Sequence, residues 1–336
     1  MSQHPLGRRT FLAGLGALSV AGLVGCNASA GDAGTDAASP AGGGTFSFTD
    51  ARDKKVEFAL PATAVVAQSS VAATLLDFGY QVAGAYGELK PVDGKLSYQA
   101  GDLDISKLTV LSDVYGEFDV EKFAAMNPQV LIDLMFEPGK LWYLPDDLQT
   151  KVEQVSPTIG MKMLDQGLVD IIENFAELAK QLGADLEAPL VTDAKKAFED
   201  ATTKAKDAIA AKPDLTVVGI SRSADKVWIT NAAQAPDLGY WKSLGATMVD
   251  HGGKPTDYFT EISYEQLDKF SADIIYDDSR GGVIPEADKQ PTWQALPAVK
   301  AGQVVAWKPA APYSWKTNAP ILEEFATAYS NANKVT

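Results

Sequence analysis

Short apolar runs alternate with helical patterns along most of the chain. Apolar alternation at residues 46–48 and a second short strand at 56–60, separated by a polar turn, predict a hairpin. Further strands are predicted at residues 64–67, 82–86, 130–132, 216–220, 227–229, 274–276 and 304–307. Helices are predicted at residues 70–78, 119–126, 168–182, 237–244 and 319–329, and a short one opens at residue 263 behind a capping-box pattern. This alternation predicts an α/β fold with mainly parallel sheets.

The stretch from Pro189 to Ala211 differs because it has the pattern of one uninterrupted helix. Alanine and larger apolar residues recur there at steps of three and four, with charged residues between them. Proline suits the first turn of a helix, and Pro213 ends the pattern. Such a helix would be about 35 Å long. Two interpretations stay open: a long surface helix of one domain, or a rigid strut that joins two lobes.

Two segments on either side of this helix resemble each other. Residues 119–133 and 263–277 align without a gap, and both combine a helix-capping residue, a glutamate two residues later, a short helix and a buried strand that ends in aspartate. A chance likeness between two common helix–strand units is the alternative. Taken as a repeat, they predict an N-terminal lobe at residues 46–188, a connecting helix at 189–212 and a C-terminal lobe at 213–336.

The start of the chain has the pattern of an export signal. Arg8 and Arg9 precede an uncharged apolar run at residues 11–25, which is shorter than the roughly 20 residues needed to span a bilayer. The run ends at Cys26, and the small residues before this cysteine resemble a lipobox. We expect removal of residues 1–25 and a lipid anchor such as palmitate on Cys26, which holds the protein on the extracytoplasmic face of the cell membrane. Twin-arginine and general secretory export both stay open.

The residues behind this cysteine and the net charge narrow the function further. Residues 26–45 contain no large apolar side chain and are predicted to form a flexible tether. Removal of two arginines with the leader reduces 29 basic residues to 27, against 44 acidic ones, so the formal charge becomes −17. This charge argues against nucleic acid as a partner and against electrostatic adhesion to anionic lipid. Because Cys26 is the single cysteine, no disulfide forms within the chain.

Four segments of the folded part resemble one family of transport proteins. They are residues 49–57, 118–132, 262–275 and 293–305. In this order, behind a lipoprotein signal, they make residues 46–330 similar to the iron-siderophore and cobalamin type of ABC-importer substrate-binding protein. The resemblance implies two Rossmann-like lobes joined by one long α-helix, a ligand cleft between the lobes that closes only modestly, and an ABC permease as partner. We also expect a monomer without enzymatic activity.

The resemblance assigns a role to one glutamate in each repeat. In the family a glutamate on each lobe meets arginines of the permease, and the matching positions are Glu121 and Glu265. A carboxylate in the first turn of a helix is stabilised by the helix dipole and, when exposed, pairs with a guanidinium. The simpler alternative is that both residues only favour the start of their own helices.

The scarcity of histidine and cysteine favours a chelated metal over a free metal ion as ligand. Sites for free transition metals use histidine and cysteine clusters, whereas the chain behind the leader has one histidine, His251. We expect no intrinsic cofactor, with iron present only as part of a bound chelate. The predicted ligand-binding residues lie in or near loops that follow predicted strands: Tyr86, Phe136, Trp142, Tyr143, Arg222, Arg280, Tyr313 and Trp315. The alternative for each aromatic residue is core packing, and for the two arginines it is an ion pair with a neighbouring aspartate.

The number of arginines then favours one class of chelate over another. Three arginines remain behind the leader, which is few for a strongly anionic ferric catecholate. A near-neutral ferric hydroxamate siderophore is therefore favoured. Heme or cobalamin is the alternative, with Tyr86, Tyr313 or His251 as candidate axial ligands.

No sequence pattern supports an enzyme. The chain has no G-x-S-x-G elbow, no P-loop and no G-x-G-x-x-G after a strand. A Ser-His-Asp site would have to use His251, and the adjacent Asp277 and Asp278 would point to opposite faces of a strand. A surface lipoprotein hydrolase stays a distant alternative, as does a lipoprotein whose partner is purely a protein.

Overall fold

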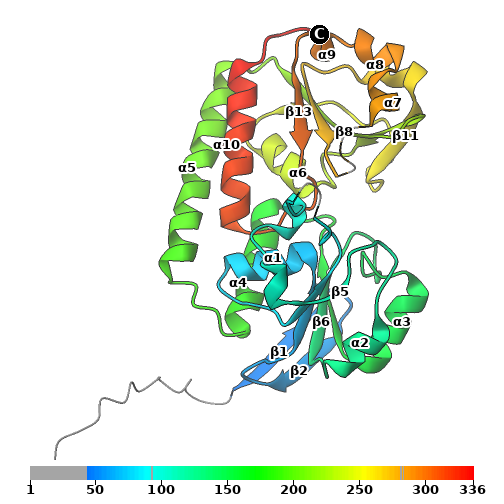
Figure 1. Ribbon diagram of the computed structural model, residues 1–336. Helices are drawn as coiled ribbons and strands as arrows, with labels where there is room; N and C mark the ends of the chain where they lie inside the picture. Colours follow the sequence, from blue (N-terminus) through cyan, green and yellow to red (C-terminus); the bar gives the residue numbers. More distant parts are fainter. Residues whose placement is uncertain (1–43, 92–93, 281, 283) are drawn as a thin grey trace, which may run out of the picture. The chain divides into compact units, whose positions relative to one another are not determined.

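The computed structural model describes residues 44–336, with the exception of residues 92–93, 281 and 283 (Figure 1). The predicted leader, Cys26 and the tether up to residue 43 therefore lie outside the described residues. Among the helices of the described part, none has both the length and the apolar character needed to cross a membrane.

The described chain begins with the predicted hairpin. β1 (Thr45–Thr49) pairs antiparallel with β2 (Lys55–Ala59), so the first strand takes in the last residue of the predicted tether. Arg52 in the turn donates hydrogen bonds to the Asp50 carboxylate and to the backbone carbonyl of Thr158. Because Thr158 opens the last strand of the next sheet, Arg52 fixes the hairpin to that sheet.

One sheet is built entirely from residues 65–162. Its order is β5-β4-β3-β6-β7, and every pairing in it is parallel. The strands are β3 (Val65–Gln68), β4 (Gly84–Tyr86), β5 (Thr109–Ser112), β6 (Val130–Met135) and β7 (Thr158–Lys162).

Helices cover both faces of this sheet. Successive strand residues point to opposite faces, so neighbouring residues of one strand pack against different helices. Val130 and Ile132 of β6 pack with α1 and α4, whereas Leu131 packs with α2 and α3. The helices are α1 (Ser69–Asp77), α2 (Val120–Ala125), α3 (Asp146–Val155) and α4 (Leu168–Gln181), with the 3₁₀ helices η1 (Tyr98–Ala100) and η2 (Ile105–Lys107). A strand buried on both faces needs a continuous apolar run, which explains the sequence of β6.

The second sheet uses residues 216–307 and is mixed. Its order is β11-β9-β8-β12-β13, with β10 paired to β8; β9 is antiparallel to both of its neighbours, and the other pairings are parallel. The strands are β8 (Thr216–Arg222), β9 (Lys226–Thr230), β10 (Thr247–Met248), β11 (Phe259–Ser263), β12 (Ile274–Asp278) and β13 (Val304–Trp307). The helices beside them are α6 (Pro236–Ser243), η3 (Tyr264–Phe270), α7 (Pro285–Asp288), α8 (Pro291–Ala295) and α9 (Pro297–Lys300).

Two long helices pack against each other beside the sheets. Figure 1 shows α10 (Trp315–Asn331, red) lying alongside α5 (Pro189–Ala211, green). The start of α10 is bonded to the N-terminal lobe, because Ser314 and Thr317 donate hydrogen bonds to the buried Asp77 at the end of α1. The two lobes are therefore joined by more than the single helix that the pattern predicts.

The structure confirms the α/β prediction and each predicted strand, with three differences. The C-terminal sheet is mixed because β9 follows β8 through a short turn and runs antiparallel to it, and β11 runs antiparallel to β9. The segment behind Ser263 is a 3₁₀ helix, and the Ser263 side chain makes no capping hydrogen bond. Helix α10 begins at Trp315 rather than at Ala319, because the Ser314 side chain caps it and the helix continues through Pro320 in its second turn. The pattern does not predict several short or weakly patterned elements: β5, α3, β7, β10, β11, α7, α8 and α9.

Candidate ligand-binding site between the lobes

A row of six aromatic rings crosses from one lobe to the other. Neighbouring ring centroids are 4.5 to 6.1 Å apart, and the interplanar angles of 66° to 89° make every contact edge-to-face. The crossing point is the pair Phe136 and Tyr258, at 6.1 Å. In spatial order the interlobe aromatic row is Tyr115, Tyr143, Trp142, Phe136, Tyr258 and Phe259.

Three of these rings come from the loop that follows β6, as the sequence predicts. The carboxyl ends of parallel strands meet at one edge of a sheet, where such loops form binding sites. The backbone N–H of Trp142 donates to the Leu134 carbonyl (2.9 Å), which folds the loop back onto its own strand. Beside the row the N-terminal lobe has a hollow of about 200 Å³, lined in part by Tyr115, Phe136 and Trp142.

Hydrogen bonds hold both the side chain and the backbone of Tyr143. Its hydroxyl donates a hydrogen bond to Glu88 (2.6 Å), and its backbone N–H donates to Asp133 (3.4 Å). Asp133 also accepts hydrogen bonds from the Tyr86 hydroxyl and from the Leu134 N–H, both at 2.7 Å. Burial raises the pKa of Asp133 to about 7, although these hydrogen bonds act in the opposite direction.

Tyr86 therefore supports the loop after β6 indirectly, through its hydrogen bond to Asp133. Its side chain is only 1% exposed and packs edge-to-face on Phe118. Burial and the neighbouring Asp133 carboxylate raise the pKa of its hydroxyl far above the usual range. In this arrangement Tyr86 offers no surface to a ligand, and its part is to position Asp133.

The C-terminal lobe contributes a guanidinium to the same region. Arg280 forms a forked pair with Asp278, through Nε (3.0 Å) and Nη2 (2.6 Å) to the same oxygen, and its side chain stays 34% exposed. Burial raises the pKa values of Tyr98, Tyr143 and Tyr258 above the usual range, while the charge of Arg280 lowers all three. Arg280 thus acts electrostatically on tyrosines of both lobes.

The segment between β13 and α10 ties the lobes together beside this region. The Tyr98 hydroxyl donates to the Pro309 carbonyl (2.8 Å), and the Ser70 hydroxyl donates to the Ala310 carbonyl (2.9 Å). Ala310 has a positive φ of 55°, which alanine rarely adopts, so these contacts hold a strained turn in place. The next aromatic residue, Tyr313, is buried and stacks on Phe175.

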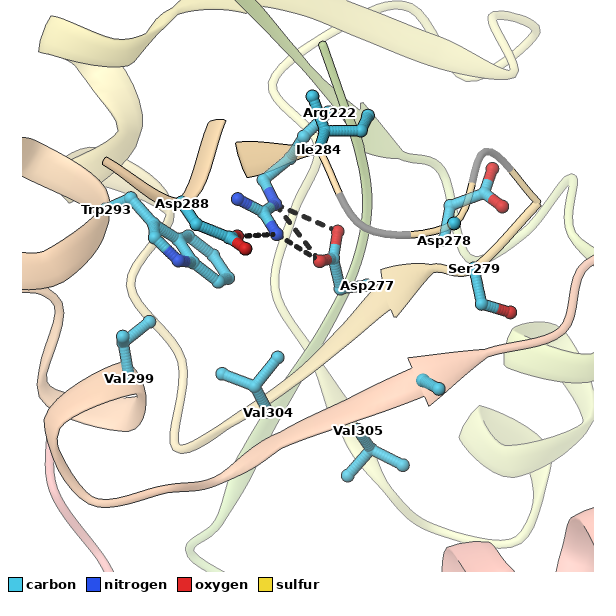
Figure 2. Close-up of a pocket in the computed structure, with 12 residues that line it drawn as sticks. Arg222, Asp277, Asp278, Ser279, Ile284, Asp288, Trp293, Val299, Val304 and Val305 are labelled. Carbon is cyan, nitrogen blue, oxygen red and sulfur yellow. Dashed lines mark hydrogen bonds and ion pairs between the residues drawn. The ribbon is translucent and has the colours of Figure 1, made fainter. Parts of the chain in front are cut away.

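Figure 2 shows Arg222 among Asp277, Asp288 and Trp293 in the C-terminal lobe. It forms ion pairs with Asp277 (2.5 Å) and Asp288 (2.9 Å), and its guanidinium stacks on Trp293 at 3.8 Å from the ring centroid. Its side chain is 8% exposed, at the edge of a cavity of about 510 Å³ in the C-terminal lobe that Val304 also lines. The alternative interpretation of Arg222, an ion pair with a neighbouring aspartate, is therefore what the structure shows.

Trp315 and His251 also lie apart from the aromatic row. Trp315 is buried against Phe198 of α5, with Lys195 over its ring. His251 is buried in the loop after β10, where its Nε2 is 3.1 Å from the Lys254 carbonyl. In the described part of the chain, no three histidine, cysteine, aspartate or glutamate side chains converge as metal ligands would.

The two predicted permease contacts are exposed. Glu121 lies in the first turn of α2, whose N-cap Asp119 accepts a hydrogen bond from the Lys122 N–H. Glu265 lies in the first turn of η3. Both carboxylates are thus open to a partner, and their contact with a permease stays a prediction.

Sequence reasoning missed several residues of this region. Glu88 could have been found by the same rule as Tyr86, because it follows β4 by two residues. Tyr258 directly precedes β11, a strand whose pattern is too weak to predict. Tyr98 opens the short helix η1 and Tyr115 lies in a loop; neither segment has a periodic pattern, so only the tertiary structure brings these residues to the site.

Comparison with known proteins identifies one matching family and several similar structures. The periplasmic binding protein family matches residues 65–311. The structure of DesE, a ferric-siderophore receptor protein from Streptomyces coelicolor, is 38% identical with a TM-score of 0.81 over 87% of this chain and 100% of that chain. The structure of SirA from Staphylococcus aureus, complexed with staphyloferrin B, shares the fold at 15% identity with a TM-score of 0.60, over 85% and 99% of the two chains.

A curated relative, the Fe(3+)-citrate-binding protein YfmC of Bacillus subtilis (strain 168), is 27% identical over 162 residues. That match covers 47% of this chain and 49% of the relative, so it spans about half the length of each. Together the comparisons confirm the predicted fold of two lobes with a cleft between them. The chain belongs to the periplasmic binding protein family.

Proposed function

We propose that the protein is an extracytoplasmic solute-binding lipoprotein that takes up a ferric siderophore between its lobes and delivers it to an ABC importer. One observation carries the ligand class: the interlobe aromatic row and Arg280 are found in a chain that is 38% identical to a ferric-siderophore receptor over the whole length of that receptor. Members of this family bind substrates and are not enzymes, which is the reason to set the hydrolase alternative aside.

Within the siderophores, the charges favour a hydroxamate over a catecholate. A ferric catecholate is strongly anionic and needs several free cations. Arg52 and Arg222 are both committed to internal ion pairs, and Arg280 is already paired with Asp278. Aromatic walls suit the largely apolar arms of a hydroxamate chelate.

The heme and cobalamin alternative receives less support. Tyr86 and Tyr313 are buried in the core of the described structure, and both lack the exposed oxygen that an axial ligand must offer. His251 is buried in a loop against a backbone carbonyl.

Delivery rests on the exposed glutamates and on the anchor. Glu121 and Glu265 are exposed, which supports the proposal that they pair with permease arginines, as the family resemblance implies. A lipid on Cys26, followed by a tether of residues 26–45, would hold the folded part within reach of the permease.

The test is a titration of tryptophan fluorescence in the purified full-length protein. Its ligands are a ferric trihydroxamate, a ferric catecholate, ferric citrate, heme and cobalamin. We expect saturable one-to-one quenching by the hydroxamate, and a smaller amplitude in Trp142→Phe because Trp142 belongs to the row. Trp315→Phe is the matched control, since Trp315 is buried against α5. Saturation by heme or cobalamin alone would contradict the proposal.

A further inference from the structure

A carboxylate that the ligand prediction leaves unused lies beside Tyr143 of the interlobe aromatic row. Glu88 follows β4, is half-buried, and accepts the 2.6 Å hydrogen bond of the Tyr143 hydroxyl. Among the described residues it takes part in no ion pair. Each carboxylate oxygen accepts more than one hydrogen bond, so Glu88 still offers an acceptor to a cationic donor besides the Tyr143 hydroxyl.

The other charges of the region do not balance Glu88. Arg280 is the cation that acts on Tyr98, Tyr143 and Tyr258, and its guanidinium is committed to the forked pair with Asp278. Asp237, which acts on Tyr98 and Tyr258, adds a further carboxyl and accepts a hydrogen bond from the Trp307 indole N–H (2.6 Å). Burial raises the pKa of Asp237, so the charges of the region are one arginine, which Asp278 neutralises, and a Glu88 carboxylate without an ion-pair partner among the described residues.

The rings next to Glu88 favour the same sign of charge. An ammonium group within about 6 Å of an aromatic ring is attracted to the ring face. Tyr143 contacts Trp142 on one side and Tyr115 on the other, with centroids 4.8 and 5.2 Å away. Tyr115 is 63% exposed, so its ring is open to a ligand.

We propose that this site selects ferric chelates that carry a positive charge, and that Glu88 receives a protonated amine arm of the chelate. The inference rests on the proposed function, because it names the charge class of the siderophore that the same site binds. A cationic hydroxamate would pair its amine with Glu88 and lay its chain along Tyr143 and Tyr115. Anionic chelates such as ferric citrate or a ferric catecholate would lie beside the Glu88 carboxylate, which has no cationic partner among the described residues.

The experiment compares two ferric trihydroxamates that differ in one group. One ends in a free amine, and the other is the same chelate with that amine acetylated, so that only the charge and the donor are lost. In the wild-type full-length protein we expect the amine form to bind about five- to tenfold more tightly, the range of a charge-assisted hydrogen bond at a half-buried site. A higher salt concentration should bring the affinities of the two chelates closer together, because salt screens the charge–charge interaction.

Three variants locate the effect. Glu88→Gln keeps the size and an acceptor for the Tyr143 hydroxyl, and we expect it to bring the affinity ratio of the two chelates close to one. Tyr143→Phe removes the hydroxyl but leaves the carboxylate, so the preference for the amine should persist. Glu199→Gln removes the same charge from the exposed face of α5 and should leave the ratio as in the wild type.

The outcomes separate this inference from the proposed function. Equal affinity of the wild type for both chelates would overturn the charge selection while leaving siderophore binding in place. A preference that survives in Glu88→Gln would overturn the role of Glu88. Failure of the wild type to bind either chelate would overturn the proposed function, and the charge selection with it.

Discussion

Replacement of Asp133 by asparagine tests the electrostatics behind the aromatic row. This carboxyl group is completely buried, and burial raises its pKa from 3.8 to about 7. Between these two values the folded protein holds a proton on Asp133 that the unfolded chain has released. The contribution of Asp133 to the free energy of unfolding is therefore fully present below pH 3.8 and is lost as the pH rises through 7. Each pH unit in that interval lowers the free energy of unfolding by about 1.4 kcal/mol, which amounts to about 2 kcal/mol between pH 5 and pH 7.

The assay is urea unfolding of the wild type and of Asp133→Asn at pH 5, 6 and 7, followed by far-UV circular dichroism. The asparagine oxygen still accepts the Tyr86 hydrogen bond but does not titrate. We expect the stability of the variant, relative to the wild type, to rise by about 2 kcal/mol from pH 5 to pH 7. Asp113→Asn, at an exposed position after β5, is the matched control and should show no such change.

A stability difference that stays constant from pH 5 to pH 7 would refute the reasoning, because Asp133 would then not titrate in this window. Burial also raises the pKa values of Asp237 and Asp277, but both groups are present in the wild type and in the variant, so their contributions cancel in the stability difference. Despite their burial, hydrogen bonds hold the pKa values of Asp50 and Asp273 below the usual range, so their contributions change below pH 4 and with the opposite sign.

Three further predictions address structure, delivery and anchoring. Arg222→Ala should lower the free energy of unfolding by about 3 kcal/mol in urea titrations, because it leaves the half-buried Asp277 without its main partner. A folded variant should still bind the chelate; lost binding with unchanged stability would contradict this. Charge reversal at both Glu121 and Glu265 should leave chelate affinity unchanged and abolish uptake of radioactive iron by cells, and undiminished uptake would exclude these contacts. Cys26→Ser should move the protein from the membrane fraction to the soluble fraction and abolish incorporation of labelled palmitate; retention in the membrane would point to another anchor.

Local pattern was sufficient for β6, the strand that leads into three rings of the site. The apolar run at residues 130–132 predicts a strand buried on both faces, and such a strand belongs to a parallel sheet covered by helices. The carboxyl end of that strand then places Phe136, Trp142 and Tyr143 at the binding edge of the sheet. The structure brings these three rings together. Their contact with a ligand stays a prediction.

Local pattern was not sufficient to separate the two candidate arginines. Arg222 and Arg280 both stand at or just after the end of a strand in the same sheet and near aspartates, so the sequence treats them alike. In the structure Arg222 lies on the sheet face that α8 covers, where Trp293 and two carboxylates enclose it. Arg280 lies in the loop beyond β12 and keeps part of its surface. The difference depends on which helix packs over which face, and strand periodicity carries no information about that.

The sequence by itself determined the α/β class, the paired helix–strand units and the length of the connecting helix, because each follows from the period of apolar residues over one segment. Only the tertiary structure decided which aromatic side chains face the ligand and which carboxylates lack a cation. Tyr86 and Tyr143 both lie near strand ends, yet one is buried beneath Asp133 and the other belongs to the aromatic row beside Glu88. Burial and charge balance arise from contacts between segments far apart in the chain, such as Phe136 with Tyr258, and these contacts exist only once both lobes are folded.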